Sequence, residues 1–141
     1  ESPKFMIHAL KDPDGANLDR AQIVKGWINE KGESEERVFD VALSDNRKLR
    51  KKPRKMDSIK STVDVADASY SNSIGATSLS AIWQDPDFDP KQRALYYVRV
   101  IEIPTPRWTA YDAKFFDQKD TEEIPMVTRE RVYSSPIWYN P

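Results

Sequence analysis

Short apolar stretches alternate along the chain with polar segments that contain proline, aspartate or asparagine. Residues 94–103 are apolar at both odd and even positions, which predicts a central strand with both faces covered. Residues 21–28 and 37–43 are rich in β-branched and aromatic side chains and flank a polar turn at 29–33. These two stretches therefore predict a β-hairpin.

Weaker alternation predicts the other strands of the first two thirds of the chain. Residues 4–10 form a short apolar strand that stops at the turn residues 12–15. Residues 62–65 and 68–70 alternate weakly and residues 77–83 alternate again, so two more strands are expected there. The residues between 44 and 61 break this pattern and predict a solvated loop.

Prolines determine where the predicted elements end in the last third of the chain. Two prolines end the central strand, because proline cannot donate a hydrogen bond to a sheet. Thr109 is then expected to cap a short helix through residues 110–116. The last extended segment, residues 131–139, contains Pro136, which indicates an edge position or a bulge.

These elements together predict an all-β fold. Ten prolines against four glycines favour short strands over long helices. We expect an antiparallel β-sandwich, immunoglobulin-like or jelly-roll-like, with at most one short helix. The 141 residues fit one domain, 1–141, and a start at Glu1 suggests a piece of a longer protein.

Composition excludes several classes of site. The 22 Lys and Arg residues nearly balance the 23 Asp and Glu residues, so no overall field favours a nucleic acid or a membrane surface. The absence of cysteine and the single histidine exclude disulfides, thiolate metal sites and histidine-rich metal sites. No apolar run is long enough for a membrane span or a signal peptide, and none of the familiar catalytic motifs occurs. We therefore expect no catalytic residue and no cofactor in this chain.

Two acidic stretches are candidate metal sites. Asp12, Asp14, Asn17 and Asp19 place four oxygen-bearing side chains within eight residues, as Ca²⁺ requires. They lack the spacing of an EF-hand loop, and the same residue types form ordinary tight turns. The alternating aspartates 85, 87 and 89 are open to the same two interpretations. His8 has no partner residue at a known motif spacing, so a core or edge histidine is the favoured interpretation.

A basic run and an aromatic cluster are candidate binding sites. Seven of the nine residues from 47 to 55 are basic, which could attract phosphates or an acidic partner. The run has no interleaved aromatics, so a solvated linker is favoured over a nucleic-acid site. The anion-binding candidates in it are Arg47, Lys48, Arg50, Lys51 and Lys52.

The aromatic cluster follows the central strand and consists of Arg107, Trp108, Tyr111 and Asp112. These residue types suit an anion, a sugar ring or the centre of a protein interface. A purely structural arrangement, with Arg107 paired to Asp112 and Trp108 closing the end of the core, is an equal alternative.

Five strings in the chain resemble a known family. They are ALKDPDGANLDR (9–20), QIVKGW (22–27), NSIGA (72–76), YVRVIEIPTPRWTAYD (97–112) and SSPIWY (134–139). The chain is similar over nearly its whole length to the C-terminal part of the bacterial domain-of-unknown-function family DUF3604. The basic run 47–55 departs from the family pattern, so a phosphate-binding role there is specific to this protein or absent.

The resemblance implies an accessory role. Members of the family are longer, commonly carry an export signal, and have an upstream part that resembles metal hydrolases of the polymerase-and-histidinol-phosphatase type. The implied divalent metal belongs to that upstream domain, which is the expected partner, and the implied location is periplasmic or secreted. We therefore expect a non-catalytic domain that places Arg107, Trp108, Tyr111 and Asp112 at the interface or at the mouth of the neighbouring active site.

Two other functions remain open. A sandwich could bind a polysaccharide or another extracellular ligand through exposed, coplanar tryptophans, although the pattern already suggests that Trp27 and Trp83 are buried. The basic run could form an anion-binding or nucleic-acid module with steeply salt-dependent binding.

Overall fold

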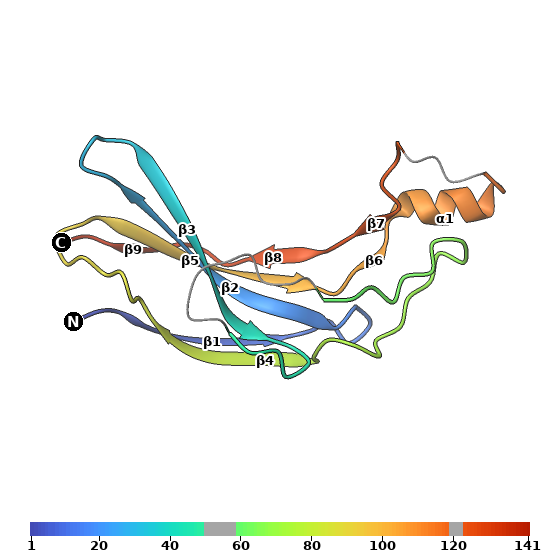
Figure 1. Cartoon of the computed structure of the whole chain (residues 1–141), viewed down its shortest axis with the longest axis horizontal. Coiled ribbons are helices and arrows are strands. Elements are labelled where there is room, and N and C mark those ends of the chain that lie inside the picture. The colour runs from blue at the N-terminus through green and yellow to red at the C-terminus, as the bar shows by residue number, and fades with distance from the viewer. Residues whose placement is uncertain (50–58, 119–122) are drawn as a thin grey trace.

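The computed structural model describes residues 1–49, 59–118 and 123–141 and is an antiparallel all-β fold with one short helix (Figure 1). Two sheets pack on each other, which agrees with the predicted sandwich. The elements in chain order are β1 (Lys4–Leu10), β2 (Leu18–Ile28), β3 (Ser34–Leu43), β4 (Ser78–Gln84), β5 (Ala94–Glu102), β6 (Thr105–Pro106), α1 (Trp108–Phe115), β7 (Val127–Thr128), β8 (Arg131–Tyr133) and β9 (Ile137–Tyr139).

The larger sheet has the order β3-β2-β5-β8, and β9 continues alongside β5 after β8. The smaller sheet is the antiparallel pair β1-β4, which covers one face of the larger sheet. The main core lies between them and includes Ile7 and Leu79 from the small sheet and Ile23, Tyr96 and Val100 from the large one. In β1 and β4 the inward side chains alternate with exposed ones, as the period of a half-buried strand requires.

The hairpin is confirmed and is longer than predicted. β2 and β3 pair antiparallel across a turn in which the Asn29 side chain accepts hydrogen bonds from the amides of Lys31 and Glu33. Gly32 has a φ of 81°, the left-handed region that glycine enters without strain. Asn29 and Gly32 therefore set the turn, as their residue types predict.

β5 is central, as predicted, but only one of its faces packs against another layer. Tyr96 and Val100 are buried against the small sheet, whereas Leu95 and Tyr97 on the other face are half-buried. The prediction of two covered faces is wrong because β1 and β4 form one layer on one side only. The apolar outer positions of β5 are partly shielded by neighbours within their own sheet, such as Tyr133 beside Tyr97.

Three other local predictions need correction. The stretches 62–65 and 68–70 form no strand and share only an isolated bridge between Asp64 and Ser69. The helix begins at Trp108, and Arg107 rather than Thr109 occupies the N-cap position. Ile59, at the end of the predicted solvated loop, is buried.

The final segment is split. Residues 131–139 form two short strands, β8 and β9, separated at Pro136, and both pair with β5 at the edge of the sheet. The edge position predicted from Pro136 is therefore confirmed. β6 and β7, two residues each, were not predicted, because so short a pair has no periodic signal.

Candidate functional site

α1 projects from one end of the sandwich on a short two-stranded ribbon, β6-β7 (Figure 1). The backbone amide of Arg107 donates to the carbonyl of Met126 at 2.8 Å, and the hydroxyl of Thr109 donates to the carbonyl of Pro125 at 2.6 Å. Thr109 therefore links the helix to the segment around Pro125 and does not cap the helix. An eight-residue helix is marginal in isolation, so these contacts hold its first turn in place.

Lys114 links the last turn of α1 to the loop that contains Asp67. Its ammonium donates to the Asp67 carboxylate at 2.7 Å and to the Asp67 carbonyl at 2.8 Å. The hydrogen bond and charge of Lys114, with a hydrogen bond from Ser69, hold the pKa of Asp67 below its ordinary value. A cation in the last turn also complements the negative end of the helix dipole.

One side of α1 is apolar and exposed. Thr109 and Ala110 are buried against the ribbon, whereas Trp108, Tyr111 and Phe115 recur at helical spacing and are 63%, 49% and 81% exposed. We call the exposed side, with Trp108, Tyr111, Asp112 and Phe115, the α1 face. Phe116, directly after the helix, is also exposed and lies edge-on to Phe115, with ring centroids 5.0 Å apart. Aromatic side chains gathered and exposed in this way are typical of a protein interaction surface.

The predicted aromatic cluster is therefore brought together, but not as a closed end of the core. Arg107 is half-buried, and its guanidinium carbon lies 6.0 Å from the centroid of the Trp108 ring. Among the residues that the structure describes, no ion pair joins Arg107 to Asp112, and Trp108 is exposed and belongs to neither core cluster. The α1 face thus offers aromatic surface and one carboxylate to a partner, with the Arg107 guanidinium beside it.

The acidic residues 12 to 19 have separate roles. The Asp12 carboxylate accepts the amide of Asp14 at 2.9 Å, which is an ordinary Asx turn. The Asn17 side-chain amide donates to the carbonyls of Asn72 and Ile74 in the facing loop, and its backbone amide donates to the Asn72 side-chain oxygen. The Asp19 carboxylate is buried among arginines. In the described ranges, no group of three or more His, Cys, Asp and Glu side chains could hold a metal ion.

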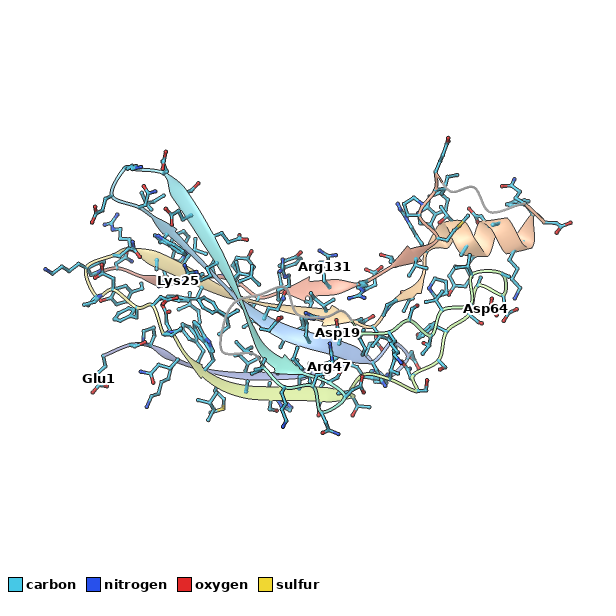
Figure 2. The ribbon with its side chains drawn as sticks, viewed as in Figure 1. Glu1, Asp19, Lys25, Arg47, Asp64 and Arg131 are labelled. Atoms are coloured by element: carbon cyan, nitrogen blue, oxygen red, sulfur yellow. The ribbon has the colours of Figure 1, made fainter. Side chains whose placement is uncertain are left out.

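Asp19 is the centre of a buried arginine cluster that the sequence analysis missed. A register shift in β2 between Leu18 and Arg20 marks an irregularity at Asp19. Its carboxylate accepts from Arg20 at 3.0 Å, from Arg129 at 3.4 Å and from Arg47. Figure 2 shows Asp19 and Arg47 near the middle of the molecule, with Arg131 above them. Arg47 of the basic run is thus a structural residue.

The rest of the basic run is only partly described. Lys48 is exposed, and Arg50, Lys51 and Lys52 lie outside the described residues. Asp85, from the second acidic stretch, is buried and accepts from Lys25 at 2.6 Å and from the Tyr96 hydroxyl at 2.7 Å. Asp87 and Asp89 take part in local turns. His8 lies on the edge strand β1 and is hydrogen-bonded to Ser80 at 2.7 Å, so the edge interpretation is confirmed.

The tryptophans do not form one sugar-binding platform. Trp27 and Trp83 pack against the main core, as their strand positions predict. Trp108 and Trp138 are exposed, but α1 and β9 lie at opposite ends of the molecule (Figure 1). Coplanar stacking on one ligand is therefore not available to this pair.

Phe115 and Phe116 were not predicted as site residues, although the spacing of Trp108, Tyr111 and Phe115 by three and four was a signal for one helix face. The only helix of the described residues is too short and too polar to span a membrane.

A family model with the description "Protein of unknown function (DUF3604)" matches residues 1–141. No curated protein and no solved structure matches the chain significantly.

Proposed function

The chain belongs to the DUF3604 family, and on this basis we propose that it is a non-catalytic accessory domain that docks through the α1 face onto a metal-dependent hydrolase domain of the same, exported bacterial protein. The observation that carries the proposal is the exposure of Trp108, Tyr111 and Phe115 together on one side of α1. Both ends of this helix are hydrogen-bonded to neighbouring segments, so the exposed side chains are held in place. A surface of this kind is stabilised when a partner covers it.

The distribution of charge in the chain agrees with a docking role. The conspicuous buried ions are committed to structural pairs, Lys25 to Asp85 and Asp19 to its arginines, so they are not free for acid–base chemistry. Arg107 lies next to the α1 face and has no carboxylate partner among the described residues. We expect the Arg107 guanidinium to bind an anionic substrate or a carboxylate of the neighbouring domain.

Hydroxyl-radical footprinting of the intact protein and of residues 1–141 alone tests the docking. We expect Trp108, Tyr111 and Phe115 to be protected only in the intact protein. Trp138, with nearly the same exposure as Trp108 (65% against 63%), is the matched control and is expected to react equally in both. Equal labelling of Trp108 in the two samples overturns the proposal.

Activity measurements test whether catalysis requires the neighbouring domain. With Mn²⁺ or Zn²⁺ added, phosphatase, phosphodiesterase or sulfatase activity is expected in the intact protein and absent from residues 1–141. Arg107→Ala in the intact protein is expected to lower activity or stability. Arg37→Ala, at an exposed arginine, is expected to leave activity unchanged and to change stability by less than about 1 kcal/mol. Activity in residues 1–141 alone contradicts a non-catalytic role.

A further inference from the structure

A groove opens between the two sheets on the side away from the β2-β3 hairpin. It has a volume of about 560 Å³ and is bounded by β1 on one side and by β8 on the other. Val98 and Val100 of β5 contribute apolar surface to it, together with Ile7 of β1. Val132 of β8 lines the same groove and is 62% exposed, although it belongs to the strand that borders the core. The sandwich is thus open where a further strand would complete it.

The edge of β1 that borders this groove has unpaired main-chain groups. Among the described residues, β1 pairs only with β4. The bond from the Lys11 amide to the Thr77 carbonyl fixes which residues point toward β4, and in an antiparallel ladder the alternate residues point away. The N–H and C=O groups of Met6, His8 and Leu10 are therefore directed outward.

β8 presents its own unpaired groups to the opposite side of the groove. The Glu102 amide donates to the Glu130 carbonyl and the Ser134 amide donates to the Val98 carbonyl. By the same alternation, the main-chain groups of Arg131 and Tyr133 point away from β5. The groove is therefore flanked by two strand edges, with an apolar floor between them.

Natural edge strands are usually protected by a bulge, a proline or an inward-pointing charge. β1 has none of these: its register with β4 runs without a shift from Lys4 to Leu10, and its inward side chains are Phe5, Ile7 and Ala9. The regular, unprotected edge of β1 suits the addition of a strand.

The charge at one end of the groove indicates what the added strand carries. Asp12, Glu102 and Glu130 line this end. Burial raises the pKa of Glu102, and the charges of Glu130 and Asp12 raise it further. The cations that also line the groove are Lys11 and Arg131, and the Lys11 ammonium is bound to three main-chain oxygens of the turn. Three carboxylates thus face two cations, and a further cation would relieve their repulsion.

We propose that this groove binds an extended peptide by β-strand addition, with alternate apolar side chains on the valine floor and a lysine or arginine beside Glu102 and Glu130. The main-chain edges supply affinity, the floor selects small β-branched side chains, and the acidic end sets the direction of the peptide. The groove shares no residue with the α1 face, so this proposal stands independently of the accessory role.

Fluorescence anisotropy with a labelled heptapeptide tests the proposal. The probe alternates valine and threonine after an N-terminal lysine, and saturable binding is expected. Val132→Asp places a charge on the floor at an exposed position and is expected to weaken binding by about tenfold or more. Ile82→Asp on β4, also exposed but remote from the groove, is the matched control and leaves binding unchanged.

Changes in the probe distinguish strand addition from simple apolar contact. N-methylation of alternate peptide nitrogens removes main-chain donors and is expected to abolish binding. Replacing the lysine by glutamate is expected to weaken it. No binding of the original probe, or equal binding after N-methylation or in Val132→Asp, overturns the proposal. Sedimentation equilibrium is measured in parallel: a dimer of this chain that Val132→Asp dissociates would identify a second copy as the occupant and also overturn it.

Discussion

The two ends of β2 carry two different buried ionic networks. Near its C-terminal end, Lys25 is paired with one carboxylate, Asp85, which also accepts the hydroxyl of Tyr96. Near its N-terminal end, Asp19 accepts from three arginines. Figure 2 shows Lys25 and Asp19 well separated along the sheet. The first network is a closed pair of one cation and one carboxylate. The second is larger, because Arg20 also pairs with Asp40.

The two networks also differ in how far their side chains are exposed to water. The side chains of Lys25 and Asp85 are 4% and 0% exposed, so each ion depends on the other. In the Asp19 cluster the carboxylate is fully buried, but the side chains of Arg47 and Arg129 remain 21% and 30% exposed. Water can solvate the exposed parts of these two arginines, so they depend less on the Asp19 carboxylate than Lys25 depends on Asp85.

The largest expected effect comes from breaking the closed network. Lys25→Met leaves the Asp85 carboxylate buried without its cation, and we expect a loss of about 3–5 kcal/mol in the free energy of unfolding. Urea denaturation measures it. The double variant Lys25→Met with Asp85→Asn is the control and is expected to lose less than the sum of the two single changes. Additive losses would contradict a closed pair.

A smaller effect is expected at the other end of β2. Asp19→Asn removes the shared carboxylate, but Arg47 and Arg129 can turn toward water, so we expect a loss of about 1–3 kcal/mol. The same urea measurement compares the two sites directly. A larger loss for Asp19→Asn than for Lys25→Met would show that partial exposure does not relieve the arginines.

Of the two networks, only the closed one, which contains Tyr96, is expected to lose stabilising free energy at alkaline pH. Burial and the hydrogen bond to Asp85 raise the pKa of Tyr96 above its usual 10.0. A raised pKa means that this stabilising contribution is fully present below pH 10 and is lost as pH rises above it, because the unfolded chain then releases the phenolic proton first. Tyr96→Phe is expected to cost about 1 kcal/mol at neutral pH and to flatten the decline above pH 10. An unchanged decline in the variant would assign it to another group.

The smallest effect is expected at the surface of the closed network. Arg37 pairs with Asp87, which is 50% exposed, next to the carbonyl that accepts from Lys25. Arg37→Ala is expected to change the free energy of unfolding by less than about 1 kcal/mol, and added salt to reduce even that. A loss comparable to that of Asp19→Asn would show that the network extends to the surface.

The strands were predicted where the pattern is strong and local. Residues 94–103 and the hairpin around Asn29 and Gly32 were found within a few residues, because strand period and turn chemistry are encoded by neighbours in the chain. The weak alternation at 62–65 did not produce a strand, since pairing in a sheet depends on a partner that the pattern does not name.

The candidate site was predicted in part. Arg107, Trp108, Tyr111 and Asp112 lie together at the start of α1, as their closeness in the chain suggests. Phe115 was missed as a member of that surface, because its exposure depends on which side of α1 packs against the β6-β7 ribbon. The groove between β1 and β8 could not be predicted at all, since it depends on how the two sheets pack on each other.

The all-β class, the hairpin, the central strand and the family follow from residue types and their local spacing, so the amino-acid sequence was enough to predict them. Which charges are buried together depends on the folded arrangement of the strands. Asp19 meets Arg129 across 110 positions and Lys25 meets Asp85 across 60, and no periodicity links such residues. Their pairing follows from strand order and register, which bring distant segments side by side and exclude water from between them.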